Sequence, residues 1–249
     1  MASGSNTGNG DGRGGGFRTT RWSIVLAAGN PGTAASKDAL STLCETYWYP
    51  LYAFARRRGE TVEQAEDLTQ GFFARLLEKN ELRNADRDRG RFRTFLLTAF
   101  KYFMANEWDR DRAKKRGGHL EKLHLDYVAA ESRYNTSLSQ GLTPDQEFER
   151  QWALSILDGV LGQLAREYEL AGKRQQFEAL QAFLPGSVGA ATYEQCAETL
   201  VRSVPAVKMA VSRLRGRYKL VLREWIASTL EDPKDVEEEI RYLLNVLSG

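Results

Sequence analysis

Apolar residues recur every three or four positions along most of the chain, which is the spacing of an α-helix. The first stripe spans residues 40–54 and is centred on Tyr47 and Leu51. Pro50 lies inside it and predicts a kink or a break, because proline removes a helix hydrogen bond. No segment shows the strict alternation that is typical of a half-buried strand. The pattern therefore predicts an all-α protein.

A second helix is predicted to begin after Thr61, whose hydroxyl forms a capping box with Gln64. Its apolar stripe consists of Ala65, Leu68, Phe72 and Leu76. Its opposite side carries Asp67, Gln70, Ala74 and Glu78. Residues 79–90 have no periodicity, so they are predicted to form a charged loop.

A long helix is predicted over residues 91–116, where two glycines end it. Its inward face is expected to consist of Phe92, Phe95, Leu96, Ala99 and Phe103. Its outward face is expected to consist of Thr94, Leu97, Lys101, Met104, Trp108 and Arg112. Aromatic side chains interleaved with cations form a surface on which unpaired nucleobases stack. The alternative is that these aromatic side chains belong to the core.

The sharpest signal is a closely spaced helix pair over residues 192–226. A capping box starts a short helix at Thr192, and Ser203 is placed to cap the second helix. The second helix has an apolar stripe of Val207, Ala210, Val211, Leu214, Tyr218, Val221 and Trp225. Its far side carries Lys208, Ser212, Arg215, Lys219 and Arg223. A short helix, a short turn and a helix with a cationic face predict a helix-turn-helix. An amphipathic helix for a membrane or a protein partner is the alternative.

The pattern also predicts how the chain is divided. Residues 118–143 are polar, weakly patterned and closed by Gly141 and Pro144, which indicates a flexible linker between two small helical domains. Further helices are predicted over residues 144–168 and 173–183. The predicted parts are a disordered tail (1–16), a first helical domain (17–117), the linker (118–143), a helix-turn-helix domain (144–230) and an acidic C-terminal helix (231–249). The acidic helix is expected either to pack on the second domain or to bind a regulator.

Composition narrows the choice of function. Of the 249 residues 42% are apolar, enough for a core, yet none of the apolar runs approaches membrane-spanning length. The chain has only two cysteines, which lie far apart, and two histidines, which lie in the predicted linker. This argues against a metal site, a cofactor or an enzyme. It also favours a cytoplasmic protein. Residues 83–116 carry eleven Lys or Arg against five Asp or Glu, and residues 199–223 carry seven against none. Two basic patches indicate a polyanionic partner touched at two places.

Several segments resemble bacterial RNA polymerase sigma factors of the extracytoplasmic-function (ECF) type. Residues 48–79, which contain AEDLTQ, and residues 89–118 resemble region two of these proteins. Residues 192–226, which contain SVPAVKMAVSRLR, resemble region four. The motifs occur in the expected order and spacing, and the lead-in TRWSIVLAA fits the same group. The resemblance covers most of the chain but not its two extremities.

The resemblance implies a non-enzymatic subunit that binds core RNA polymerase through its clamp helices and flap, recognises promoter DNA and helps to open it. An anti-sigma factor or another regulator is a further expected partner. The residues implied to dock on polymerase are Asp67, Gln70 and Phe73. Those implied to read the distal promoter element are Ser203, Lys208, Ser212, Arg213 and Arg215. Those implied to recognise and open the proximal element are Asn84, Arg93, Lys101, Trp108 and Arg112.

One position departs from the family pattern. The turn of the helix-turn-helix usually carries glycine where this chain has Val201, and a β-branched side chain resists positive φ. The turn must therefore adopt another conformation or bear strain. The alternative function is a stand-alone helix-turn-helix regulator, which would have no need for an outward Asp67 and Gln70. A hydrolase is a third class, but the chain has no glycine-rich phosphate loop and no HExxH motif.

Overall fold

The computed structural model describes residues 34–79, 91–113, 126–137, 141–187, 189, 191–227, 229–230 and 232–248. Over this part of the chain the structure is helical and contains no strand, so the predicted all-α class is confirmed. The helices are α2 (Ala34–Arg57), α3 (Val62–Lys79), α4 (Phe92–Ala113), α5 (Tyr127–Ser137), α6 (Pro144–Leu170), α7 (Arg174–Leu180), α8 (Tyr193–Thr199), α9 (Val204–Ala227) and α10 (Val236–Ser248), with short 3-10 turns at η3 (Gln181–Phe183) and η4 (Pro233–Asp235).

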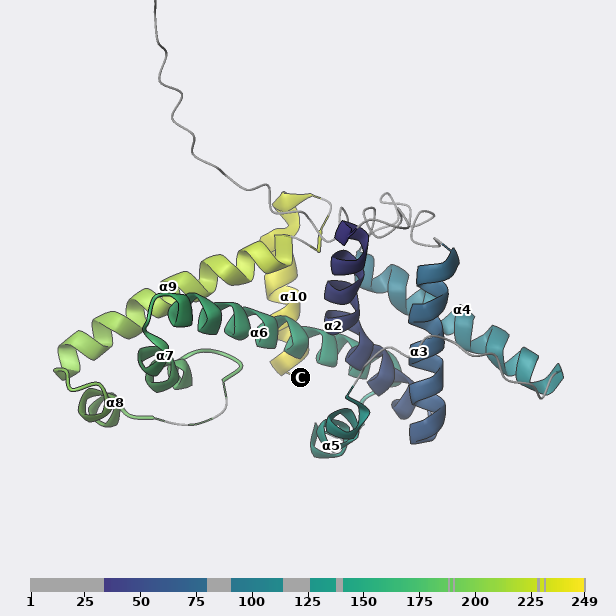
Figure 1. Ribbon diagram of the computed structural model, residues 1–249, viewed down its shortest axis with the longest axis horizontal. Coiled ribbons are helices and arrows are strands. Elements are labelled where there is room, and N and C mark those ends of the chain that lie inside the picture. The colour runs from purple at the N-terminus through teal and green to yellow at the C-terminus, as the bar shows by residue number, and fades with distance from the viewer. Residues whose placement is uncertain are drawn as a thin grey trace, which may run out of the picture.

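Helix α6 is the centre of the fold. It contacts α2, α7, α9 and α10, and in Figure 1 α2 and α10 lie near the middle of the molecule while α7 lies towards the side that carries α8. Its side chains Phe148, Trp152, Ile156, Val160 and Leu164 are completely buried. They belong to one continuous apolar core that includes side chains from every α-helix named above. The predicted domain boundary stays a prediction, but α6, assigned to the second domain, packs on both halves of the chain.

The N-terminal half confirms part of the predicted pattern. Helix α2 continues through Pro50, so of the predicted kink or break the break does not occur. The α3 capping box forms as expected, since the Thr61 and Gln64 side chains each accept the other's backbone N–H. The predicted apolar stripe of α3 is buried throughout, but Ala74, expected on the opposite side, is buried as well.

Helix α4 is apolar around more of its circumference than its pattern suggested. Leu97 and Met104, predicted to face outward, are 7% and 0% exposed. The reason is that α4 packs its aromatic rings against two other helices. Phe100 lies 6.1 Å from the ring of Phe54 on α2 and 5.1 Å from the ring of Phe72 on α3. The flanking aliphatic residues are therefore enclosed with the rings.

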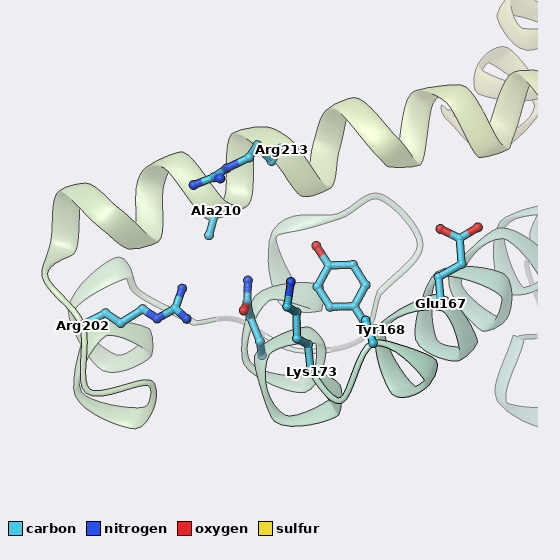
Figure 2. A pocket seen from close by; sticks show the side chains of 8 residues that line it. Glu167, Tyr168, Lys173, Arg202, Ala210 and Arg213 are labelled. Carbon is cyan, nitrogen blue, oxygen red and sulfur yellow. The ribbon is translucent and has the colours of Figure 1, made fainter.

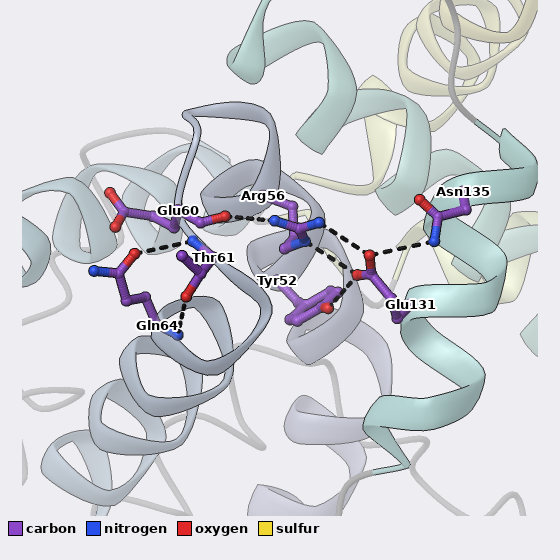
Figure 3. Close-up of polar contacts among 7 residues, drawn as sticks. All are labelled: Tyr52, Arg56, Glu60, Thr61, Gln64, Glu131 and Asn135. Carbon is purple, nitrogen blue, oxygen red and sulfur yellow. Dashed lines mark hydrogen bonds and ion pairs between the residues drawn. The ribbon is translucent and has the colours of Figure 1, made fainter.

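Residues 126–137 were expected to belong to a flexible linker. They include the helix α5, which the sequence pattern did not predict. Asp126 caps the helix by accepting the backbone N–H of Ala129. Glu131 fastens α5 to α2, as Figure 3 shows: its carboxylate accepts hydrogen bonds from Tyr52 at 2.6 Å and from Arg56 at 2.9 and 3.0 Å. The hydrogen bonds from Arg56 and Tyr52 lower the pKa of the Glu131 carboxyl. Polar contacts between distant residues thus order this segment.

Candidate nucleic-acid and polymerase interface

The predicted helix-turn-helix forms from α8 and α9. The capping box at Thr192 and Gln195 starts α8, as expected. The apolar stripe of α9 is buried as predicted, with Trp225 half-buried at its end, where its indole N–H donates to the Gln163 side chain at 2.8 Å. Tyr218 donates its hydroxyl to the carbonyl of Pro185 at 3.2 Å, and burial raises its pKa to about 12. The stripe therefore fixes α9 rigidly on the domain.

The turn between α8 and α9 places Val201 at φ 51°, in the left-handed region. The N–H of Arg202 donates to the carbonyl of Ala197, and that of Val201 to Glu198. These two bonds define the Schellman motif, which ends helices and favours glycine at the left-handed position. The turn thus keeps the conformation that glycine would adopt. The sequence left open whether this turn adopts another conformation or bears strain, and the structure shows that the turn bears strain.

Four of the five residues predicted to read DNA lie on the outward side of this unit. Ser203, Lys208, Ser212 and Arg215 are exposed. The Lys208 ammonium lies 5.5 Å from the ring of Tyr193, and Arg215 donates to the carbonyl of Phe183 at 3.1 Å. These contacts bring the two charged groups close to the domain, while both side chains stay exposed.

Arg213, the fifth, faces a different direction. It lines a hollow of about 410 Å³ between α9 and the α6–α7 turn, together with Tyr168, Lys173 and Arg202 (Figure 2). Consecutive residues of an α-helix are about 100° apart around the helix axis, so Arg213 points well away from Ser212. Arg213 is exposed like the other four, and its predicted role in reading DNA stays a prediction. Three cations from separate segments meet at this hollow, a polyanion-attracting arrangement beside the predicted reading helix.

The residues predicted to dock on polymerase lie on α3. Asp67 is exposed and Gln70 half-buried, on the side of the helix away from its apolar stripe. Phe73 is only 1% exposed and packs edge-on against Phe72 at 5.8 Å. Phe73 is therefore part of the core, and its predicted direct contact with a partner is not available in this structure. The reason is that α3 is enclosed by α2 and α4 across more than one stripe.

The residues predicted to open DNA are divided between surface and interior. Trp108 is 39% exposed, with the Arg58 guanidinium 4.9 Å from its ring. Lys101 forms an ion pair with Asp145 at the start of α6. Arg93 is 4% exposed and is held among carboxylates, contrary to its expected role as an accessible cation. Asn84 lies outside the described residues, as does the side chain of Arg112 on α4.

The pattern missed two features of α4. Tyr102 is 70% exposed and is the most exposed aromatic side chain in the described part of this helix. Its position outside the inward stripe was a signal that could have identified it. Arg91, at the start of the helix, pairs with acidic side chains of α10, 147 and 148 positions away. No local pattern reveals such a pairing.

Two further observations bear on the kind of site. Of the helices that the structure describes, none combines the length and apolar composition needed to span a bilayer. Among the same residues, no three His, Cys, Asp or Glu side chains gather as a metal-binding group.

The chain was compared with known proteins. The family model described as ECF sigma factor matches residues 34–181, which is more than half of the chain and extends from α2 to the start of η3. No curated protein and no solved structure matches. The match includes the α3 face and the α4 helix but ends before the helix-turn-helix. From the extent of this match, together with the all-α fold, this chain belongs to the family of ECF sigma factors, which act in transcription initiation.

Proposed function

We propose that this protein binds core RNA polymerase through α3, reads duplex promoter DNA with α9 and helps to open the duplex with α4. The observation that carries the proposal is the orientation of α9. Its apolar stripe is buried, while Ser203, Lys208, Ser212 and Arg215 remain exposed on the outward side. A rigid helix with exposed donors and cations fits the major groove, which is wide enough for one helix.

The α9 contacts divide into two physical kinds. A side chain that bonds a base edge contributes about 1–3 kcal/mol of discrimination at one position. A cation on a phosphate strengthens binding to all sequences and steepens the salt dependence by about one unit. Lys208 and Arg215 are proposed for base or phosphate contacts at the outward face. Arg202 and Arg213, which line the neighbouring hollow, are placed for phosphate alone.

Duplex binding is tested by Lys208→Glu in the full chain. A promoter fragment selected with the wild-type protein should lose at least tenfold in affinity in a filter-binding or anisotropy titration. Lys234→Glu on η4 makes the same change of charge beyond the C-terminal end of α9 and should leave affinity within twofold. Equal affinities of the two variants would show that another face contacts the duplex.

Polymerase docking is tested by Asp67→Arg combined with Gln70→Ala. Both side chains lie away from the α3 stripe, so the fold should remain intact by circular dichroism. Co-purification with core polymerase should be lost, because an arginine introduces repulsion or an unpaired charge into the interface. Asp235→Arg, an exposed acid on η4, is the control and should still co-purify. Unchanged co-purification of the α3 variant would refute the docking assignment, and duplex binding without any core binding would favour the stand-alone regulator.

A further inference from the structure

Three consecutive glutamates at the start of α10 each pair with a cation on another helix. Glu237 pairs with Arg223 of α9 at 2.8 Å. Glu238 and Glu239 pair with Arg91, just before α4, at 3.3 and 2.9 Å, and Glu239 also pairs with Arg93. The acidic helix thus occupies cations from both helices proposed to contact DNA.

The pairing with Arg93 is buried on all sides. Glu239 is fully buried and Arg93 is 4% exposed. Glu149 of α6 contributes a second carboxylate at 2.7 Å. The guanidinium lies between two aromatic rings, 4.3 Å from the centre of Trp152 and 4.6 Å from that of Tyr242. A buried charge persists only when paired, and α10 supplies one of the two carboxylates that keep Arg93 in the interior, the other being Glu149 of α6.

Helix α10 is also attached by its apolar face. Val236 and Leu243 are buried, and Ile240 packs against the same core. This face contacts α6 and α9, while the glutamates reach α4 and α9. The helix therefore bridges the two halves of the chain at the place where Figure 1 shows it beside α6.

We propose that α10 is an intramolecular competitor of DNA, and that its release uncovers a binding site for single-stranded DNA formed by Arg91, Arg93 and Trp152. This inference rests on the proposed function, because it names the strand that the site would hold during promoter opening. While α10 is packed on the protein, its carboxylates bind Arg91 and Arg93. Once α10 is released, backbone phosphates of the DNA strand take the same positions.

The chemistry of the three side chains fits a melted strand. Arginine binds carboxylate and phosphate in the same bidentate manner, so glutamate and a backbone phosphate compete for one guanidinium. Trp152 is completely buried beneath Arg93, so without Tyr242 a base would stack on the Arg93 guanidinium, which the Trp152 indole supports from the other side. Stacking on an aromatic side chain stabilises an unpaired base, and arginine adds a cation–π contribution. Arg91, just before α4, lies against the same Tyr242 ring as Arg93, with its guanidinium 5.3 Å from the ring centre.

The test measures single-stranded DNA binding by the full chain. Glu238→Gln with Glu239→Gln keeps the apolar face of α10 and removes the two α10 charges that pair with Arg91 and Arg93, while Glu149 of α6 stays in place. A fluorescent oligonucleotide titrated across salt concentrations should bind roughly tenfold tighter at 0.1 M salt, with a salt slope steeper by about 1.4 for two freed phosphate contacts. The control, Asp232→Asn with Asp235→Asn, removes two charges that touch neither arginine. Equal affinity and slope for the two variants would overturn the proposal.

A second measurement needs no substitution. Hydrogen exchange of the wild-type chain should show protected amides over residues 236–248, and the oligonucleotide should remove that protection while residues 207–214 stay protected. Protection of α10 that persists with DNA bound would overturn the proposal even if the double variant does not fold.

Run-off transcription with core polymerase is measured in parallel. If wild-type protein gives transcripts while the protection of α10 is unchanged by DNA, only the proposed role of α10 as a competitor is refuted. If DNA releases α10 but no transcripts form, the proposed function is refuted.

Discussion

Replacing Val201 by glycine should stabilise the protein, although it deletes a side chain. Val201 sits at φ 51° in the Schellman motif that ends α8, and its side chain is 91% exposed. A left-handed conformation costs an L-residue about 1–2 kcal/mol, and glycine avoids that cost. Glycine in turn loses about 0.5–1 kcal/mol of additional backbone freedom on folding. Because almost no packing is lost, the net gain is about 1 kcal/mol.

The chain contains its own reference for this geometry. Helix α6 ends in the same motif, since the N–H of Lys173 donates to the carbonyl of Tyr168 and that of Gly172 to Glu169. Gly172 has φ 67°, and an added Cβ would meet no atom within 4 Å. Gly172→Val therefore recreates the strain of Val201 without a clash, and it should destabilise the protein by about 1 kcal/mol.

The assay is urea unfolding of the full chain, followed by helical circular dichroism for wild type and both variants. The free energy of unfolding should rise for Val201→Gly and fall for Gly172→Val by similar amounts, and the melting temperature should shift by about 2–4 °C in the same directions. Promoter binding by Val201→Gly should match wild type, because the turn conformation is unchanged. A loss of stability in Val201→Gly, or none in Gly172→Val, would refute the strain at this turn.

Two further predictions concern packing and charge. Glu131→Gln should release α5 from α2, with faster amide exchange over residues 127–137. In wild type the same release should occur on acidification. The folded state lowers the pKa of the Glu131 carboxyl below its ordinary value of 4.5. The stability that this carboxylate contributes is therefore complete above pH 4.5 and is lost as the pH falls through the lowered pKa. Exchange at pH 3 that equals exchange at pH 7, after correction for intrinsic rates, would contradict this. Gly159→Ala should cost about 1–3 kcal/mol, since its Cβ would lie 2.3 Å from the ring of Trp225. Gly162→Ala on the same helix meets open space and should stabilise by up to about 1 kcal/mol, so equal effects of the two substitutions would be inconsistent with the packing of α6 on α9.

The local elements were predictable because local rules decide them. The capping boxes at Thr61 and Thr192 and the apolar stripes of α3 and α9 follow from spacing alone, and the structure confirms them. The pattern was wrong where a helix is enclosed on more than one side. Leu97 on α4 and Phe73 on α3 lie outside the expected stripes and are buried by neighbours that no periodicity reveals.

Contacts between distant residues were the other source of error. Glu131 orders α5 through side chains 75 and 79 positions away, so a segment with weak pattern is helical. Arg93 looked like an exposed cation of α4, yet its partner Glu239 lies 146 positions further along the chain. Charge runs predict which residues repel or attract, but only the tertiary packing decides which opposite charges meet. The role of Asp67 and Gln70 stays a prediction.

Transcription from core polymerase tests the central claim most directly. Purified protein is added to bacterial core RNA polymerase with a pool of genomic templates, and defined run-off transcripts are measured against core polymerase alone. Wild-type protein should give transcripts that begin at particular promoters. These transcripts should disappear with Asp67→Arg and Gln70→Ala and should decrease with Lys208→Glu. An absence of promoter-dependent transcripts from every template, with polymerase shown to be active by a known sigma factor, would contradict it.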